Sequence, residues 1–181
     1  MKVTETNLKG CVIIEPEVFE DERGYFFESF NVSKFEKLIS QSVNFVQDNQ
    51  SFSKKGVLRG IHYQIGEHAQ AKLVRVVQGK VIDVAVDLIK GSTTFGQYIA
   101  VELSAENKKQ LFIPRGFGHG FVVLSDTAEF FYKCDNYYHK ESEGGVIYND
   151  PQINIDWGLS DNKISVSEKD ASLPKLKDAR L

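Results

Sequence analysis

The strongest constraint on the fold of this chain is a two-residue alternation of apolar and polar side chains. In residues 81–88, four aliphatic side chains share one face of a strand, and Asp83 and Asp87 occupy the other. This period predicts β-strands. Residues 73–77 and 81–88 flank Gly79, which predicts a β-hairpin. Many short strands with few helices predict an antiparallel sandwich or barrel, with a jelly roll as the favoured form.

Two other local patterns stand out against the strands. Ser33 and Glu36 have the spacing of a capping box and are followed by apolar residues at helical spacing, so a short helix over residues 33–41 is predicted. Residues 116–120 are glycine-rich, but the spacing does not fit a dinucleotide-binding loop and no βαβ pattern surrounds it. We therefore predict a turn there.

Composition narrows the class of protein. The chain has 181 residues, 26% charged and 41% hydrophobic, with a net charge of −3. These values are typical of a soluble globular protein and argue against a nucleic-acid binder, which needs a basic excess. No apolar run reaches membrane-spanning length, and Cys11 and Cys134 have neither disulfide-framework nor metal-site spacing. We expect one domain over residues 1–181, no membrane, and a cytoplasmic location.

Several polar residues can converge inside such a barrel, where they are costly unless they hold a charged or hydrogen-bonding ligand. They are Arg59, His62, Lys72, Arg75, His119 and Tyr132. Residues three apart on a regular strand point to opposite faces. A bulge at Gly60 would place Arg59 and His62 in the same cavity. The alternative keeps His62 inside and Arg59 outside in a salt bridge.

A metal site is the next question. Pro114, Gly116 and His119 have the spacing of the second motif of the cupins, in which the histidine binds a barrel-bound metal. The first cupin motif should supply two histidines, yet Gln64 stands where His62 would have its partner. An amide is a poor ligand for the transition metals such sites hold. We therefore expect a cupin-like barrel without a metal.

Taken together, motifs along nearly the whole chain resemble the dTDP-4-dehydrorhamnose 3,5-epimerase family. No single block is specific, but the ordered set is. The blocks are Asp21-x-Arg23-Gly24-x-Phe26-x-Glu28, Gln47-Asp48-Asn49-x-Ser51, residues 57–64, residues 70–75, residues 83–87, residues 113–121, Tyr132-Lys133-x-x-x-Tyr137-Tyr138, Asn149-Asp150-Pro151 and Ser167-Glu168-Lys169-Asp170.

The resemblance implies an all-β, cupin-like jelly-roll barrel with a few short peripheral helices. It implies an isomerase that needs neither a metal nor a cofactor. The enzyme would invert C3″ and C5″ of dTDP-4-dehydro-6-deoxy-D-glucose, on the route to dTDP-L-rhamnose. It also implies a homodimer in which the N-terminal segment of one chain reaches the pocket of its partner. The alternatives are an epimerase of one centre only and a sugar-nucleotide-binding cupin without catalysis.

The resemblance also implies roles for individual residues. His62 is the general base, Asp170 orients it, Tyr132 is the general acid on the opposite face of the sugar, and Lys72 lies near the C4″ keto oxygen. Tyr138 stacks on the thymine. Further contacts to the sugar nucleotide are expected from Arg23, Phe26, Glu28, Gln47, Asn49, Arg59, His119, Glu143 and Lys169.

Plainer interpretations stay open for several of these residues. Asp170 completes a capping box with Ser167. Tyr132 can fill the core with its hydroxyl bonded to backbone, and Lys72 can be a solvated charge at a sheet edge. A base and an acid present together favour the enzyme over the binding module, because inversion needs proton transfer on both faces and binding does not.

Overall fold

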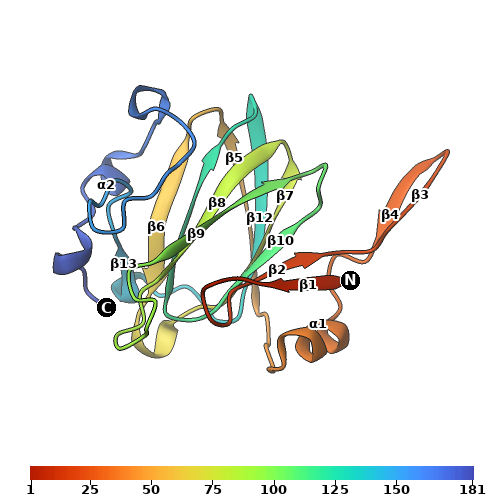
Figure 1. Ribbon diagram of the computed structural model, residues 1–181, viewed down its shortest axis with the longest axis horizontal. Helices are drawn as coiled ribbons and strands as arrows, with labels where there is room; N and C mark the ends of the chain where they lie inside the picture. Colours follow the sequence, from red (N-terminus) through yellow and green to blue (C-terminus); the bar gives the residue numbers. More distant parts are fainter.

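The computed structural model describes residues 1–181 and confirms an all-β jelly roll, in which two antiparallel sheets face each other (Figure 1). One sheet has six strands in the order β1 (Lys2–Glu5), β2 (Val12–Glu15), β10 (Gln110–Ile113), β7 (Lys72–Gln78), β12 (Thr127–Cys134) and β5 (Gln47–Lys54). The other has five, in the order β13 (Glu143–Gly145), β6 (Leu58–Gln64), β11 (Phe117–Val123), β8 (Lys80–Asp87) and β9 (Tyr98–Ser104).

The helices are short and peripheral. The α-helices are α1 (Val32–Ile39) and α2 (Glu168–Ala171), and the single 3₁₀ turns are η1 (Gly66–His68), η2 (Lys140–Ser142), η3 (Asp161–Lys163) and η4 (Leu176–Asp178). None of them combines the length and apolar character that crossing a bilayer requires.

Apolar side chains fill three regions. The interior between the sheets is packed with residues such as Val74, Leu111 and Phe130. The outer face of the five-stranded sheet packs against the C-terminal segment, which contributes Trp157. The outer face of the six-stranded sheet packs against α1, where the Phe35 ring lies 5.3 Å from a ring of β10. Packing on both sides of the sheets removes these apolar side chains from water, which is the main source of stability here.

Strand β8 shows why the alternation is more than a division between core and solvent. Val84 and Val86 lie on its outer face under the C-terminal segment, while Val81 and Ala85 face the interior. The acidic residue Asp83 shares that interior face and is 0% exposed. The polar positions of this strand therefore point into the protein and not into water.

The predicted hairpin around Gly79 is wrong. Strands β7 and β8 follow each other in the chain but belong to different sheets, so the chain crosses from one layer to the other at Gly79. This residue has φ 79°, and a Cβ there would lie 2.1 Å from the Thr127 carbonyl oxygen. A glycine at a tight corner and a glycine in a hairpin turn give the same local pattern, because both need positive φ.

The predicted helix exists, but a different residue caps it. Helix α1 begins at Val32, and the N-cap is Asn31, whose side chain accepts from the Lys34 amide. The Glu36 carboxylate instead accepts from the Ser42 hydroxyl and the amide that follows it. The helix ends at Ile39, because the next residue has positive φ. Ser33 and Glu36 thus do not form the expected capping box.

The glycine-rich stretch 116–120 is mostly strand and not the predicted turn. Only Gly116 has positive φ, and β11 begins at Phe117. Gly118 and Gly120 lie within the strand, and glycine is needed at both positions because neighbouring atoms leave no room for a side chain. A Cβ on Gly118 would lie 2.4 Å from an Ile61 methyl carbon.

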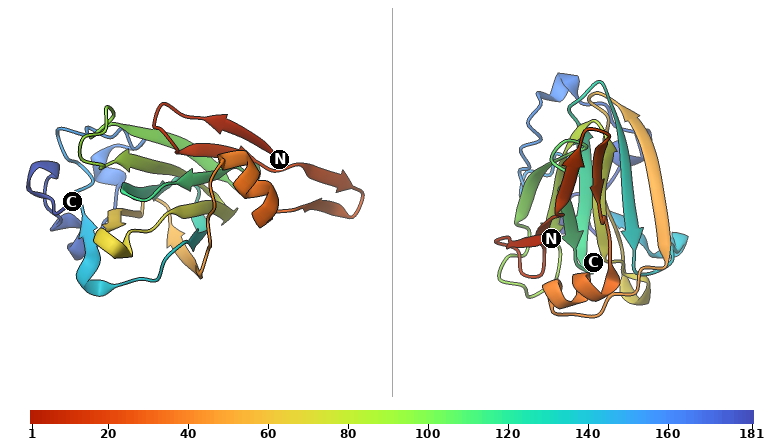
Figure 2. Two further views of the ribbon diagram at one scale, coloured as in Figure 1. Left: turned by 90° about the horizontal axis from the view of Figure 1, so that it is seen from below. Right: turned by 90° about the vertical axis from the view of Figure 1, so that its right-hand side faces the viewer.

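The N-terminal hairpin of β3 (Val18–Asp21) and β4 (Gly24–Phe27) stands apart from the two large sheets. It projects from the end of the barrel near the N-terminus, as Figures 1 and 2 show. Phe19, Tyr25 and Phe26 on this hairpin are 58%, 58% and 70% exposed. An isolated two-stranded hairpin is marginally stable in water, and soluble monomers seldom expose aromatic side chains together.

Candidate active site

A cavity of about 450 Å³ opens between the two sheets, and polar side chains dominate its lining. Most of the site residues predicted from the sequence meet there. They are Asn49, Arg59, His62, Lys72, His119, Tyr132, Tyr138, Glu143, Lys169 and Asp170. Such a concave site with convergent polar groups is the usual form of a small-molecule binding site.

A bulge in β6 explains how Arg59 and His62 both reach the cavity. His62 pairs with His119 and Arg59 pairs with Phe121, so β6 has one residue more than β11 between these two pairs. The extra residue shifts the alternation by one, which confirms the predicted bulge at Gly60. The alternative with Arg59 outside in a salt bridge is wrong, because Arg59 lines the cavity and has no acidic partner; its Nε donates to the Ser53 hydroxyl at 3.1 Å.

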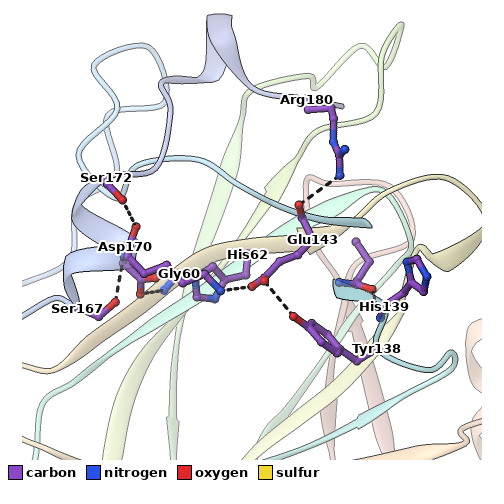
Figure 3. A network of polar contacts seen from close by, with 11 residues as sticks. Gly60, His62, Tyr138, His139, Glu143, Ser167, Asp170, Ser172 and Arg180 are labelled. Atoms are coloured by element: carbon purple, nitrogen blue, oxygen red, sulfur yellow. Dashed lines mark hydrogen bonds and ion pairs between the residues drawn. The ribbon is translucent and has the colours of Figure 1, made fainter. Parts of the chain in front are cut away.

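His62 is held by a carboxylate from the far end of the chain. Asp170 Oδ1 lies 2.8 Å from His62 Nε2, and Asp170 Oδ2 accepts from the Gly60 amide at 3.2 Å. Figure 3 shows Asp170 entering from α2, with Ser167 beside it. A carboxylate only accepts, so Nε2 carries the proton and the free Nδ1 of a neutral ring is the basic nitrogen.

Only half of the predicted capping box of Ser167 and Asp170 forms, because the Asp170 carboxylate bonds to His62 and Gly60 and not to the Ser167 amide. Ser167 is the N-cap of α2, and its hydroxyl accepts from the Asp170 amide at 3.1 Å. Only the backbone of Asp170 is used in this contact. Burial raises the pKa of the carboxyl, but hydrogen bonds and charge from His62 and Gly60 outweigh it, so the pKa lies below its usual range.

The opposite wall of the cavity comes from the six-stranded sheet. Lys72 on β7 and Tyr132 on β12 face the interior, and the Lys72 Nζ lies 5.7 Å from the centre of the Tyr132 ring. Strand β7 lies between β10 and β12, so Lys72 is not at a sheet edge. The Tyr132 hydroxyl has no hydrogen-bond partner in the protein, and burial raises its pKa to about 12. Burial lowers the pKa of Lys72, opposed by acidic neighbours that include Asp83.

The mouth of the cavity is a polar network. Tyr138 Oη donates to Glu143 Oε2 at 3.1 Å (Figure 3), and Lys169 Nζ donates to Glu143 Oε1 at 2.5 Å. Gln47 does not line the cavity itself. Its side chain accepts from the Tyr138 amide at 3.1 Å and donates to Asn49 at 3.0 Å, so it positions two residues that do.

Four residues lie elsewhere. Arg23 and Phe26 are on the projecting hairpin, and Glu28 bonds to Lys34 near the start of α1, so within one chain none of the three reaches the cavity. Arg75 was expected inside the barrel, but it lies on the opposite face of β7 from Lys72 and packs over the Phe131 ring. The strand period itself places residues 72 and 75 on opposite faces, and no bulge corrects it here.

Sequence reasoning missed two residues with clear structural roles. Gln64, in the place of a cupin metal ligand, accepts from the His139 amide at 2.8 Å and so holds the loop that carries Tyr138. Asp83 pairs with His119, and an acidic side chain between apolar residues of β8 was the available signal. No group of three or more histidine, cysteine or acidic side chains is arranged to hold a metal ion.

Comparison with known proteins agrees with this geometry. The sequence profile of the family described as dTDP-4-dehydrorhamnose 3,5-epimerase matches residues 5–178. The dTDP-4-dehydrorhamnose 3,5-epimerase of Salmonella typhimurium is 56% identical over 181 residues, covering 100% of this chain and 98% of the relative.

Solved structures agree as well. The dTDP-4-dehydrorhamnose 3,5-epimerase of Elizabethkingia anophelis has a TM-score of 0.95 and 59% identity, covering 98% of this chain and 97% of its own. The dTDP-6-deoxy-D-glucose-3,5-epimerase of Legionella pneumophila, in complex with dTDP-4-keto-L-rhamnose, has a TM-score of 0.94 and 51% identity, covering 98% and 93%.

Proposed function

Because this chain belongs to the dTDP-4-dehydrorhamnose 3,5-epimerase family, we propose that it inverts C3″ and C5″ of dTDP-4-dehydro-6-deoxy-D-glucose to give dTDP-4-dehydro-L-rhamnose. One observation carries the proposal. A histidine backed by a carboxylate, His62, and a tyrosine with a free hydroxyl, Tyr132, line one cavity from opposite sheets. Such a pair is suited to remove a proton from one face of a sugar and return it to the other.

The chemistry of the reaction gives each of the two residues a role. The protons on C3″ and C5″ are both α to the C4″ ketone, so removing either one gives an enolate. Nδ1 of His62 takes the proton, and Asp170 stabilises the imidazolium that forms. Tyr132 donates a proton to the carbanion-like carbon from the other side. Its raised pKa of about 12 keeps the phenol protonated at neutral pH.

The roles of Lys72 and Arg59 follow from their charge, and that of Tyr138 follows from its ring. The enolate oxygen needs a positive group nearby, and the ammonium of Lys72 supplies it from the wall that carries Tyr132. The planar guanidinium of Arg59 matches two oxygens of the diphosphate. Tyr138, which is 53% exposed at the mouth, offers a ring on which the thymine can stack.

Proton exchange tests the proposal directly. The protein is incubated with dTDP-4-dehydro-6-deoxy-D-glucose in deuterated water and followed by proton NMR. We expect the signals of both H3″ and H5″ to disappear as the L-configured product forms. Exchange with inversion at one carbon only would indicate a single-centre epimerase. Binding of the nucleotide without exchange at either carbon would indicate a binding module.

We also propose a homodimer with strand exchange between the chains. The projecting hairpin β3–β4 pairs only with itself, and its aromatic side chains are exposed. A second copy that receives this hairpin would bury them and would bring Arg23 and Phe26 toward the partner cavity. This accounts for Arg23 and Phe26, two of the predicted contact residues that stay outside the cavity of a single chain.

A further inference from the structure

His119 is the second histidine of the cavity, and it too has a carboxylate behind it. Its Nε2 lies 2.8 Å from Asp83 Oδ1. The His119 side chain is 7% exposed and Asp83 is 0% exposed, so the pair is buried. His119 pairs directly with His62 across β11 and β6, and Asp83 stands on β8, the other neighbour of β11. None of the proton-transfer steps proposed for this site uses Asp83.

The contact determines where the proton of His119 lies. A carboxylate accepts hydrogen bonds, so the Nε2 facing Asp83 carries a hydrogen. Burial lowers the pKa of His119 and outweighs the opposing effect of Asp83, so the ring is neutral at neutral pH. A neutral imidazole with its hydrogen on Nε2 has a bare Nδ1, which can only accept.

The bare nitrogen faces the cavity. His119 is one of the lining residues, and its Nδ1 has no hydrogen-bond partner in the protein. The only buried side-chain nitrogen or oxygen atom without a partner is Asp83 Oδ2. Nδ1 of His119 is therefore accessible from the cavity and can contact a ligand that binds there.

The orphaned oxygen of Asp83 argues against a purely structural role. A buried carboxylate with one unpaired oxygen costs free energy, because the atom has lost its water without gaining a donor. An amide or an apolar residue at this position would avoid most of that cost. The carboxylate is better explained by its effect on the histidine than by its contribution to stability.

We propose that Asp83 is a positioning residue of this site. It fixes His119 as the neutral tautomer protonated on Nε2, so that Nδ1 presents a hydrogen-bond acceptor to a hydroxyl group of the bound hexose. A hydroxyl can donate to Nδ1, whereas a ketone oxygen cannot, so the C4″ oxygen is left to Lys72. Only the identity of the bound hexose rests on the proposed function.

The direct test is nitrogen NMR of the wild-type protein, labelled with ¹⁵N in its histidines and free of substrate. The chain has four histidines, so the spectrum is simple. The signals of His119 are assigned by their absence in His119→Gln. We expect Nε2 of His119 to show the shift of a protonated nitrogen and Nδ1 that of a bare one at neutral pH. A cationic ring, or a ring protonated on Nδ1, overturns the proposal whether or not the chain is an epimerase.

Asp83→Asn tests the consequence. The amide can donate to Nε2, so we expect His119 to shift toward the Nδ1-protonated tautomer. One mispaired hydrogen bond to the bound sugar should raise KM roughly 10- to 100-fold with a much smaller change in kcat. We expect a Tm equal to or above that of wild type, because the orphaned charge is gone.

Asp87→Asn is the matched control. Asp87 lies on the same strand and is also buried, but its carboxylate accepts from Ser92 and Thr94 in a loop outside the cavity. We expect it to leave the His119 signals and KM unchanged. An Asp83→Asn protein with wild-type His119 signals and wild-type KM would overturn the proposal. If that variant does not fold, the wild-type spectrum decides. If the wild-type protein does not turn over the dTDP-sugar, the proposed function fails while the spectrum still decides the role of Asp83.

Discussion

His62 and Asp170 are separated by 108 positions in the chain, yet Nε2 of the first lies 2.8 Å from Oδ1 of the second. The same carboxylate also accepts from the Gly60 amide, next to the bulge that turns His62 into the cavity. Asp170 thus ties the C-terminal helix to the one place where β6 departs from regular strand geometry. The orientation and the tautomer of the proposed base depend on this contact.

Asp170→Asn should lower kcat by roughly 10⁴, as the corresponding change does in a Ser-His-Asp triad, because an amide favours the wrong tautomer of the imidazole. KM should change little, since the ring remains in place. Steady-state kinetics measure both. Glu168→Gln, on the exposed side of the same helix, is the control and should behave as wild type. A wild-type kcat for Asp170→Asn would remove Asp170 from the mechanism.

His62→Asn should abolish both epimerisation and solvent exchange at C3″ and C5″, because the group proposed to remove these protons is gone. The loss of kcat should be at least as large as that expected for Asp170→Asn, roughly 10⁴-fold or more. Calorimetry with dTDP should show nearly unchanged binding. His68→Asn, which removes a histidine outside the cavity lining, should keep full activity. Unimpaired turnover in His62→Asn would exclude the proposed mechanism.

Tyr132→Phe should separate exchange from inversion. The enolate still forms, but the imidazolium of His62 returns the proton to the original face. Deuterium from the solvent should therefore enter C3″ and C5″ with retained configuration, faster than product appears. Tyr137→Phe, a change in a tyrosine that is 65% exposed and outside the cavity, serves as the control. Equal loss of exchange and inversion in Tyr132→Phe would contradict the assignment of acid and base to opposite faces.

Exhaustive chelation should leave turnover unchanged. The reason is chemical: Gln64 stands where a cupin metal site needs a second imidazole, and its amide oxygen accepts from the His139 amide. Turnover is measured before and after dialysis against a chelator, with a mock-dialysed sample as the control. Loss of activity that one divalent cation restores would mean that the cavity binds a metal.

The chain should sediment as a dimer of two 20.5 kDa chains. Phe26→Asp should weaken the dimer and lower activity together, because a carboxylate on the hairpin opposes its burial against a second copy. Ile89→Asp places a carboxylate on another exposed apolar side chain, 43% exposed and away from the hairpin, and should do neither. A stable wild-type monomer with full activity would exclude the strand-exchanged dimer.

The sequence alone predicted a strand-rich fold and the set of residues proposed to carry the chemistry. Strand content followed from the two-residue period, because side-chain direction along a strand depends only on position. The bulge at Gly60 was one of two interpretations that the sequence left open, because a cation and an imidazole three residues apart share a cavity only if the alternation shifts between them. The family resemblance supplied His62, Tyr132 and Asp170 as a set, and the structure places all three in one cavity.

Only the tertiary structure decided how the strands pair and which face meets water. Gly79 has the same local preference in a hairpin and at a corner between two sheets, so the partner of β8 depends on hydrogen bonds from distant segments. The alternation shows that the two faces of β8 differ, but not that a C-terminal segment covers the apolar one. Asp83 is buried against His119 because the two sheets face each other over the opposite face of β8, and its polar position in the sequence marks the residue but not its partner.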